Sequence, residues 1–306
     1  MTGYVQTLDG ETWRLPALTQ WEILCTDGSS CDSALVVFPV EADRLQTLKA
    51  CLYLRLEEDE KTVFYGVVDE VSARCDDTGS RVEVAARGLM ALLMDSQLRQ
   101  ASFYTFQEAD AVSRLVKPFG VDKVKLGNLP AVRNFSWSTG TSPWEALCGY
   151  CRHAGNTRPR FSADGTLLLH NPEPACWNLT DSSGLTEAEF RFRRYGVIGR
   201  QTVVTAGGVL ETAENPGFTT QKVAMKTGDT LKSTWRTAEQ RVEDSLEDAA
   251  VLTVTLPGDH QAQPGDTVLL SLRQFPGENR FTLSVVKKVC GRNGRRTILE
   301  LKGEPG

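Results

Sequence analysis

Four residues are of the types that bind zinc and lie near one another in the sequence. Cys148 and Cys151 form a C-x-x-C pair, His153 follows them, and Cys176 lies downstream. Zinc is held by thiolates and imidazoles that converge tetrahedrally. One C-x-x-C pair inside an expected helix does not establish such a site, and both cysteines share an apolar stripe with Trp144, which favours core packing. The sequence therefore predicts no metal site and no cofactor.

Catalytic chemistry would need groups that the sequence does not bring together. The three histidines, His153, His170 and His260, are far apart, and no nucleophile elbow, phosphate-binding loop or zinc-protease motif is present. Neighbouring carboxylates such as Asp69 and Glu70 are frequent, but a glycosidase needs two that face each other across a cleft. We therefore expect no catalytic residues, and interpret the chain as a protein that is not an enzyme.

Aromatic residues offer a second kind of site. Tryptophans could line a platform that binds carbohydrate, although burial in a core is their commoner fate. The candidates are Trp137, Trp144, Trp177 and Trp235.

The composition is that of an ordinary globular protein with room for about two domains. The 306 residues are 41% hydrophobic and 24% charged, with a formal net charge of −5. Basic and acidic residues are interspersed, which argues against a dedicated nucleic-acid or membrane-surface binder. We expect no secretion signal and no membrane span, and the eight cysteines are expected to be free thiols in a reducing compartment.

Residues 1–97 show mainly strand patterns. Val82 and Val84 alternate with Arg81 and Glu83, as in a strand with one buried face. The expected elements are strands over Trp21–Cys25, Ala34–Val40, Thr62–Ala73 and Arg81–Ala86, and a helical stretch over Glu41–Lys49.

Residues 98–175 change to a mixed pattern. Thr105 and Glu108 have the spacing of a capping box, and so do Ser142 and Glu145, so each pair predicts the start of a helix. A hairpin with a turn over Ala163–Gly165 follows. These features predict a small α/β domain.

Residues 176–306 are again rich in strand patterns, with one helix expected over Thr237–Ala250. Strands are expected over Phe190–Val204, Leu252–Leu256, Thr267–Leu272, Phe281–Cys290 and Thr297–Leu301.

The two strand-rich parts end in similar hairpins. The pattern matches Val68 and Val71 with Val286 and Val289, and Val82–Val84 with Leu299–Leu301. This repeat predicts two related barrels, residues 1–97 and 176–306, on either side of the middle domain 98–175. The fold class is therefore expected to be α+β and mainly β, with two tandem barrel-like tube domains and an intervening small α/β domain. The residues expected at an assembly interface are Phe64, Val68, Val71, Val286 and Val289.

The order of several short segments adds a family resemblance. They resemble, in their order, the late-control-D/XkdQ-type baseplate hub proteins of contractile phage tails. The segments are Phe64–Val71, Val82–Ser96, Ser142–Leu147, Ala163–Leu167, Arg194–Gly199 and Gln263–Val268.

The resemblance implies a structural role. Hub proteins of this kind are trimers that join the tail tube to the central spike, and their two tube domains give a pseudo-sixfold ring. The implied partners are further copies of the chain, tube or tube-initiator proteins, a spike, baseplate wedge proteins and the tape measure, without stable nucleic-acid binding. The implied location is the virion baseplate, after synthesis in the bacterial cytoplasm. Because the chain ends at Gly306, soon after the last expected strand, the spike is expected to be a separate protein.

Two other functions stay open at this point. One is a tail-associated cell-wall hydrolase or peptidase, which would need a convergent acid–base or metal site. The other is a carbohydrate-binding tail module that uses the tryptophans.

Overall fold

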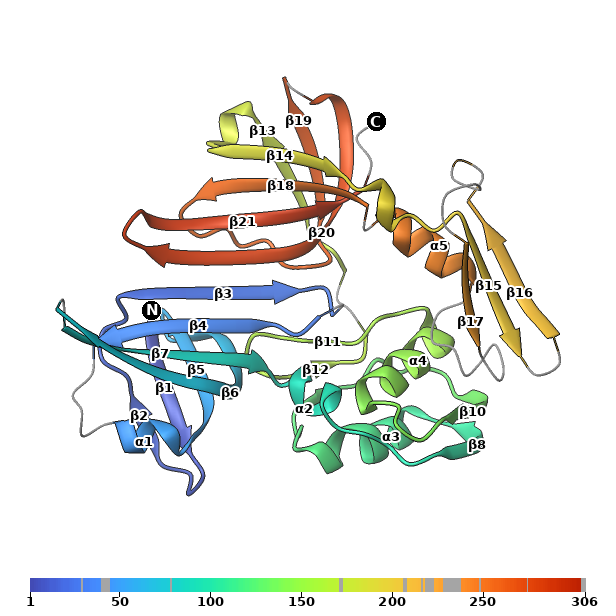
Figure 1. Ribbon diagram of the computed structural model, residues 1–306, viewed down its shortest axis with the longest axis horizontal. Helices are drawn as coiled ribbons and strands as arrows, with labels where there is room; N and C mark the ends of the chain where they lie inside the picture. Colours follow the sequence, from blue (N-terminus) through green and yellow to red (C-terminus); the bar gives the residue numbers. More distant parts are fainter. Residues whose placement is uncertain are drawn as a thin grey trace.

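The computed structural model describes residues 1–28, 30–39, 45–77, 79–170, 173–205, 208–215, 217, 223–227, 238–247, 249–273 and 275–303. Strands dominate these residues, and the predicted class, α+β and mainly β, is confirmed. Three clusters of buried apolar side chains form along the chain. Figure 1 shows two strand-rich parts, one above the other, with a small mixed part beside the lower one.

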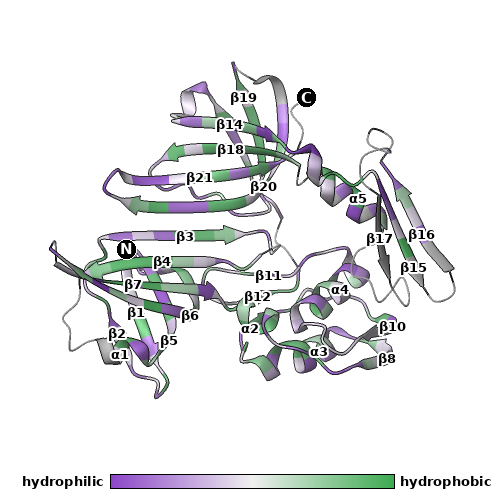
Figure 2. Ribbon diagram, viewed as in Figure 1, coloured by the Kyte–Doolittle hydropathy of each residue, from purple (hydrophilic) through white to green (hydrophobic). Residues whose placement is uncertain are grey.

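The N-terminal part is a curved sheet around one core, to which Val5, Val36, Leu54 and Val84 contribute from four strands. Figure 2 shows the apolar run along β4 that contributes to this core. Residues 40–44, which include the start of the expected helix, lie outside the described residues. The elements are β1 (Thr2–Thr7), β2 (Thr12–Arg14), β3 (Gln20–Thr26), β4 (Ser33–Pro39), α1 (Leu45–Lys49), β5 (Cys51–Glu58), β6 (Lys61–Asp76) and β7 (Gly79–Gly88).

The middle part packs helices on two small sheets. Its core includes Met90 and Leu93 of α2, so this helix packs here although residues up to 97 were expected in the first domain. The elements are α2 (Met90–Met94), β8 (Ala101–Phe106), α3 (Glu108–Ala111), a π-helical turn (Val112–Val116), a 3-10 turn (Lys117–Phe119), β9 (Val124–Lys125), β10 (Val132–Trp137), α4 (Pro143–Gly155), β11 (Arg160–Phe161) and β12 (Leu167–Leu168).

One of the two capping boxes in this part is confirmed and the other is wrong. The Ser142 hydroxyl accepts from the Glu145 amide at 3.1 Å, and the Glu145 carboxylate accepts from the Ser142 amide at 3.0 Å. Thr105, in contrast, lies in β8 and pairs with Arg133 of β10. The helix begins two residues later than predicted, after Gln107. The sequence analysis missed β8, and this strand holds Thr105 away from the cap.

The C-terminal part is a second curved sheet with an insertion. Leu252, Val268, Leu283 and Leu299 from four strands share its core. The insertion, β15–β17 with α5, lies between β14 and β18. Helix α5 lies within the predicted helix Thr237–Ala250 and β15 overlaps the predicted strand Phe190–Val204, whereas β16 and β17 were not predicted. Thr237, the expected cap, lies outside the described residues. The elements are β13 (Cys176–Thr180), β14 (Glu187–Phe192), β15 (Arg200–Thr205), β16 (Gly208–Glu214), β17 (Val223–Thr227), α5 (Ala238–Glu247), β18 (Ala250–Pro257), β19 (Thr267–Leu272), β20 (Phe275–Gly291) and β21 (Gly294–Lys302), with 3-10 turns at Asp181–Ser183 and Arg194–Gly196.

The two curved sheets have the same order of strands. The N-terminal order is β3-β4-β7-β6-β5-β1, and the C-terminal order is β14-β18-β21-β20-β19-β13. Within each part, the six strands occur along the chain in corresponding ranks. Four of the five neighbouring pairs are antiparallel in both parts; the fifth is antiparallel in β1–β5 and parallel in β13–β19. The two parts are therefore near-copies of one arrangement.

The terminal hairpins also share their register. Val71 pairs with Val84 in the first and Val286 with Leu299 in the second, so that each residue corresponds to the one 215 positions later. Both hairpins have a register shift at the same place, between Val68 and Glu70 and at the corresponding step in β20. Both turns end on a glycine with positive φ, Gly79 and Gly294.

This register corrects the match drawn from the sequence. Val71 corresponds to Val286, whereas the sequence analysis paired Val68 with Val286, three positions off. Val84 corresponds to Leu299, so the match of Val82 with Leu299 was off by two. Both β6 and β20 carry valines three residues apart, so the two sequences can be aligned on these valines in more than one register, each three residues from the next. The bulge and the turn length fix the register, and neither is evident from the pattern.

Candidate assembly surface

The three thiols and the histidine considered for zinc lie in different surroundings, and His153 is exposed near the end of α4. Cys148 and Cys151 are buried in the middle core, whereas Cys176 is exposed on β13. Burial raises the pKa of the Cys151 thiol, which disfavours the thiolate that a zinc site or a nucleophile needs. Among the described residues, no group of three His, Cys, Asp or Glu side chains is placed to hold a metal ion.

The three candidate tryptophans within the described residues do not form a common platform. Trp137 and Trp144 are buried in the middle core, and Trp177 lies on β13, where its indole donates to Asp266 at 2.8 Å. Trp235 lies outside the described residues.

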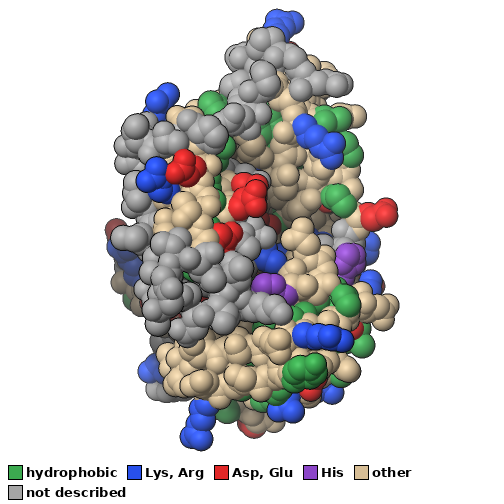
Figure 3. Space-filling model, turned by 90° about the vertical axis from the view of Figure 1, so that its right-hand side faces the viewer, with side chains coloured by type: hydrophobic (Ala, Val, Ile, Leu, Met, Phe, Trp, Pro, Cys, Tyr) green, Lys and Arg blue, Asp and Glu red, His purple; other side chains and the backbone are tan. Residues whose placement is uncertain are grey.

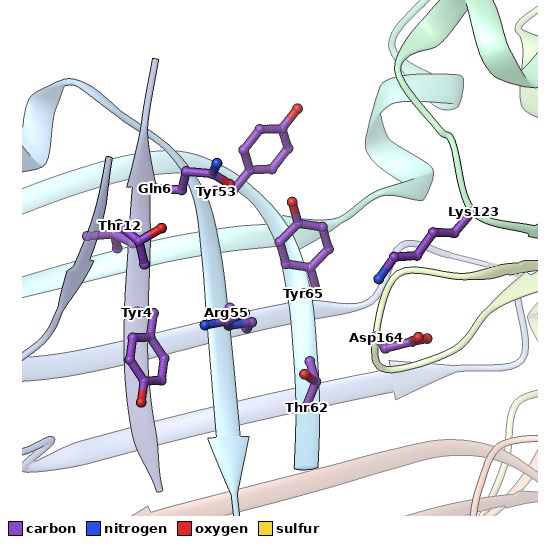
Figure 4. Close-up of a pocket in the computed structure, with 10 residues that line it drawn as sticks. Tyr4, Gln6, Thr12, Tyr53, Arg55, Thr62, Tyr65, Lys123 and Asp164 are labelled. Carbon is purple, nitrogen blue, oxygen red and sulfur yellow. The ribbon is translucent and has the colours of Figure 1, made fainter. Parts of the chain in front are cut away.

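A pocket of about 240 Å³ lies between the outer face of the N-terminal sheet and the middle part. Figure 4 shows side chains of β1, β5 and β6 on one side and Lys123 with Asp164 on the other. The rings of Tyr53 and Tyr65 stack at 5.6 Å, and the Arg55 guanidinium lies over a third tyrosine. Asp164 is the one carboxylate among its described lining residues. The lining therefore lacks the pair of carboxylates that glycoside hydrolysis uses.

Polar contacts join the middle part to both curved sheets. The Arg158 guanidinium donates to Asp27 at 3.3 Å, and Arg160 donates to the carbonyl of Pro264. A Cβ added at Gly28 would lie 2.8 Å from the Pro159 carbonyl oxygen, so this loop packs tightly on the segment that follows α4. The strand that carries Arg160 thus fixes the middle part against the rest.

Asp32 lies in the same region, and burial raises the pKa of its carboxyl to about 6, despite the Thr26 amide that donates to it at 2.7 Å. The native state therefore binds a proton more tightly than the unfolded chain, whose Asp titrates near 4. The contribution of Asp32 to stability falls as the pH rises from about 4 to about 6, because its buried carboxylate becomes charged over this range. We expect the free energy of unfolding of Asp32→Asn to depend less on pH over this range, because asparagine does not titrate.

The measurement is urea unfolding of both proteins between pH 3.5 and 7.5. The free energy of unfolding of the wild type, relative to Asp32→Asn, is expected to drop by about 1–3 kcal/mol over this range. Arg160 and Asp27 face the same carboxyl with opposite effects on its pKa. A constant difference at all pH values would contradict the assignment.

The two curved sheets are joined edge to edge in one continuous sheet. β3 pairs antiparallel with β20 over six residue pairs, from Trp21 opposite Cys290 to Thr26 opposite Val285. The Lys287 ammonium lies 2.7 Å from the Glu22 carboxylate across this seam. Figure 1 shows the strands stacked from β14 through β3 and β4 to β6. The short apolar run Trp21–Cys25 predicted a strand, but nothing in the sequence identifies the strand that pairs with it.

The residues expected at an assembly interface lie in or beside the cores. Phe64 and Val286 are 3% and 2% exposed, inside the N-terminal and C-terminal cores respectively. Val68 and Val71 pack against the N-terminal core from β6. Val289 lies opposite Glu22 in the seam within the chain. Because the side chains of Phe64 and Val286 are buried, they are not accessible to another chain.

Charged side chains are spread over the surface. Figure 3 shows both signs scattered over the coloured part of the face that carries α5 and β15. None of the helices in the described ranges is long and apolar enough to cross a membrane.

Comparison with known proteins gives matches in structure alone. No protein-family model matches the sequence, and no curated protein is significantly similar to it. The fold is similar to a tail protein from Neisseria meningitidis MC58, with a TM-score of 0.78 and 19% identity over 99% of this chain and 96% of that one. It is also similar to the 43 kDa tail protein of prophage MuSo2 from Shewanella oneidensis, with a TM-score of 0.71 and 12% identity over 98% and 97% of the two chains.

A third match extends beyond phages. A component of the Escherichia coli type VI secretion system, described as structurally similar to T4 bacteriophage tail proteins, has a TM-score of 0.53 and 11% identity over 93% of this chain and 73% of that one. The resemblance expected from the sequence is thereby confirmed as one of structure. The chain has the fold of phage tail proteins.

Proposed function

We propose that this chain is the structural baseplate hub of a contractile phage tail or phage-tail-like particle, where it joins the tail tube to the central spike. The observation that carries the proposal is the pair of sheets with the same strand order that share a seam through β3 and β20. The similarity of the whole chain to phage tail proteins supports it.

The repeat suits the symmetry that a hub must satisfy. A sixfold tube meets a threefold spike, and three chains with two similar domains each present six similar faces. We propose that the domains are residues 1–97 and 176–306, that three chains alternate them around a ring, and that DNA or the tape measure passes through it. The hub would contact tube, spike and wedge proteins in the virion and would catalyse no reaction.

The test is to tag the chain in the bacterium that encodes it, induce particle formation and purify the particles. The hub reading predicts three copies per particle, located where tube and spike meet by immuno-electron microscopy, and no assembled tails after deletion of the gene. Intact tails that form without the chain would reject the proposal.

The charge of a ring predicts how it treats DNA. A trimer would have a formal charge of −15, three times the −5 of one chain. Affinity for DNA comes mainly from clustered Lys and Arg that neutralise phosphates. We expect the purified protein to retain no duplex DNA at about 150 mM salt in a mobility-shift assay. Micromolar binding that weakens steeply with added salt would contradict the conduit role.

A further inference from the structure

Two strand edges of the continuous sheet have no partner strand among the described residues. β14 pairs with β18 on one side, and no strand of the described chain pairs with its other side. β6 pairs with β5 only as far as Val67, and beyond this residue no described strand pairs with its edge opposite β7, although α1 contacts β6. Figure 1 shows β14 at the top of the stacked strands, far from β6. An open edge offers unpaired N–H and C=O groups to another strand.

The internal repeat relates these two edges to the seam that is already filled. β3 occupies in the N-terminal sheet the place that β14 occupies in the C-terminal sheet, and β20 corresponds to β6. The seam within the chain therefore pairs β3 of the N-terminal sheet with β20 of the C-terminal sheet. The strands with unpaired edges are their equivalents in the opposite sheets: β14 is equivalent to β3, and β6 is equivalent to β20.

We propose that β14 of one chain pairs antiparallel with β6 of a second copy, in the register of the β3–β20 seam. This inference rests on the proposed ring and names the contact that would hold it together. The contact is head-to-tail, so repetition leads from chain to chain until the ring closes.

The register follows from the repeat. Ile23 and Phe190 hold equivalent places, since they pair with the equivalent residues Ala34 and Leu252. Transfer of the seam then places Ala188 opposite Cys75, as Trp21 lies opposite Cys290.

One face of the proposed pairing is apolar on both sides. Phe190 would lie opposite Ala73, and Phe192 opposite Val71. In the chain as described, Phe190 packs against the C-terminal core and Val71 against the N-terminal core. Pairing would bring these half-covered side chains together and continue the two cores across the contact, as the packing of Cys290 on the N-terminal core does within the chain.

The other face is charged, with opposite signs in register. Arg74 would lie opposite Glu189, and Glu70 opposite Arg193. All four side chains are exposed; Arg193 is the residue that follows the end of β14. Opposite charges directly across an antiparallel pair stabilise it, and like charges destabilise it.

A disulfide can test the contact, because Cys75 is a native exposed thiol. Residues opposite each other in antiparallel strands have Cα atoms about 4.5–5.5 Å apart, which a disulfide spans. We would introduce Ala188→Cys in a Cys176→Ser background and oxidise the concentrated full-length protein. Covalent dimers and trimers are expected on a non-reducing gel, with peptide mapping that joins position 75 to position 188.

Two matched variants control the chemistry. Adding Cys75→Ser must abolish the cross-linked species, and Glu187→Cys in place of Ala188→Cys must give little product, because its side chain is on the opposite face. A product that persists without Cys75, or equal yields from positions 187 and 188, would overturn the proposed register. So would the lack of any product linked through Cys75 at high protein concentration.

The charged face is tested by exchange. Arg74→Glu or Glu189→Arg alone is expected to lower the cross-linking rate up to about fivefold, and the two together should restore it. Failure of the double variant to recover would overturn the pairing of these charges.

The outcomes separate this inference from the proposed function. A chain found in tails in three copies whose cross-links avoid position 75 keeps its hub role and loses the β14–β6 contact. A chain that cross-links as expected but is missing from particles keeps the contact and loses the hub role.

Discussion

Gly66→Ala is expected to destabilise the N-terminal part by on the order of 3–5 kcal/mol, because the added methyl group has no space. A Cβ at this position would lie 2.1 Å from the carbonyl oxygen of Arg87 and 2.8 Å from the Phe64 ring. Gly66 pairs with Leu54 on one side and Gly88 on the other, where β6 passes from β5 to β7. Either pairing must open to admit the methyl group.

The carbonyl of Arg87 is poorly placed to yield. The guanidinium of the same residue is held by Asp69 at 2.6 Å and Asp95 at 2.7 Å, so its strand is tied to its neighbours. Urea unfolding gives the loss of stability, and hydrogen exchange over residues 61–88 should accelerate. Gly291→Ala is the control, since a Cβ there meets nothing within 4 Å, and a change of at most about 0.5 kcal/mol is expected. Equal stability of the two variants would show that β6 and β7 adjust.

The sequence predicted the strands whose two faces differ. The alternation of Val82 and Val84 with charged residues identified β7, and the box at Ser142 identified α4, because each signal is local. Strands β16 and β17 of the insertion were missed, since residues 208–227 show no clear alternation. Residues 101–106 were missed because Thr105 and Glu108 have the spacing of a capping box, which predicted the start of a helix where β8 ends.

The internal repeat was visible in outline and misleading in detail. Large and small residues exchange at equivalent places: Ala34 corresponds to Leu252, and Gly66 to Phe281. The two cores are built from different side chains, so strand order is retained while residue identity is lost. For the same reason the seam could not be predicted, because pairing of β3 with β20 depends on backbone edges and not on residue types that a pattern reveals.

Asp266→Ala is expected to destabilise the C-terminal part by on the order of 2–4 kcal/mol, because three partly buried hydrogen bonds to one carboxylate would be lost together. The carboxylate is 8% exposed. It accepts from the amide of Ala175 at 3.0 Å, the indole of Trp177 at 2.8 Å and the amide of Gln263 at 2.8 Å. It thereby ties the start of β13 to the turn before β19, the parallel pair that the N-terminal part lacks.

The urea midpoint of unfolding is expected to be lowest for Asp266→Ala, higher for Asp266→Asn and highest for the control variant. Asp266→Asn keeps one acceptor oxygen but turns an amide N–H₂ toward donors on its other side, so its loss should lie between those of the alanine variant and the control. Asp181→Ala is the control, because its carboxylate is half exposed and 3.7 Å from Arg273; such pairs contribute at most about 1 kcal/mol. If Asp266→Ala unfolded at the midpoint of Asp181→Ala, the three hydrogen bonds would not be what holds β13 in place. Packing of Leu179 and Trp177 against the C-terminal core would then have to position the parallel strand without them.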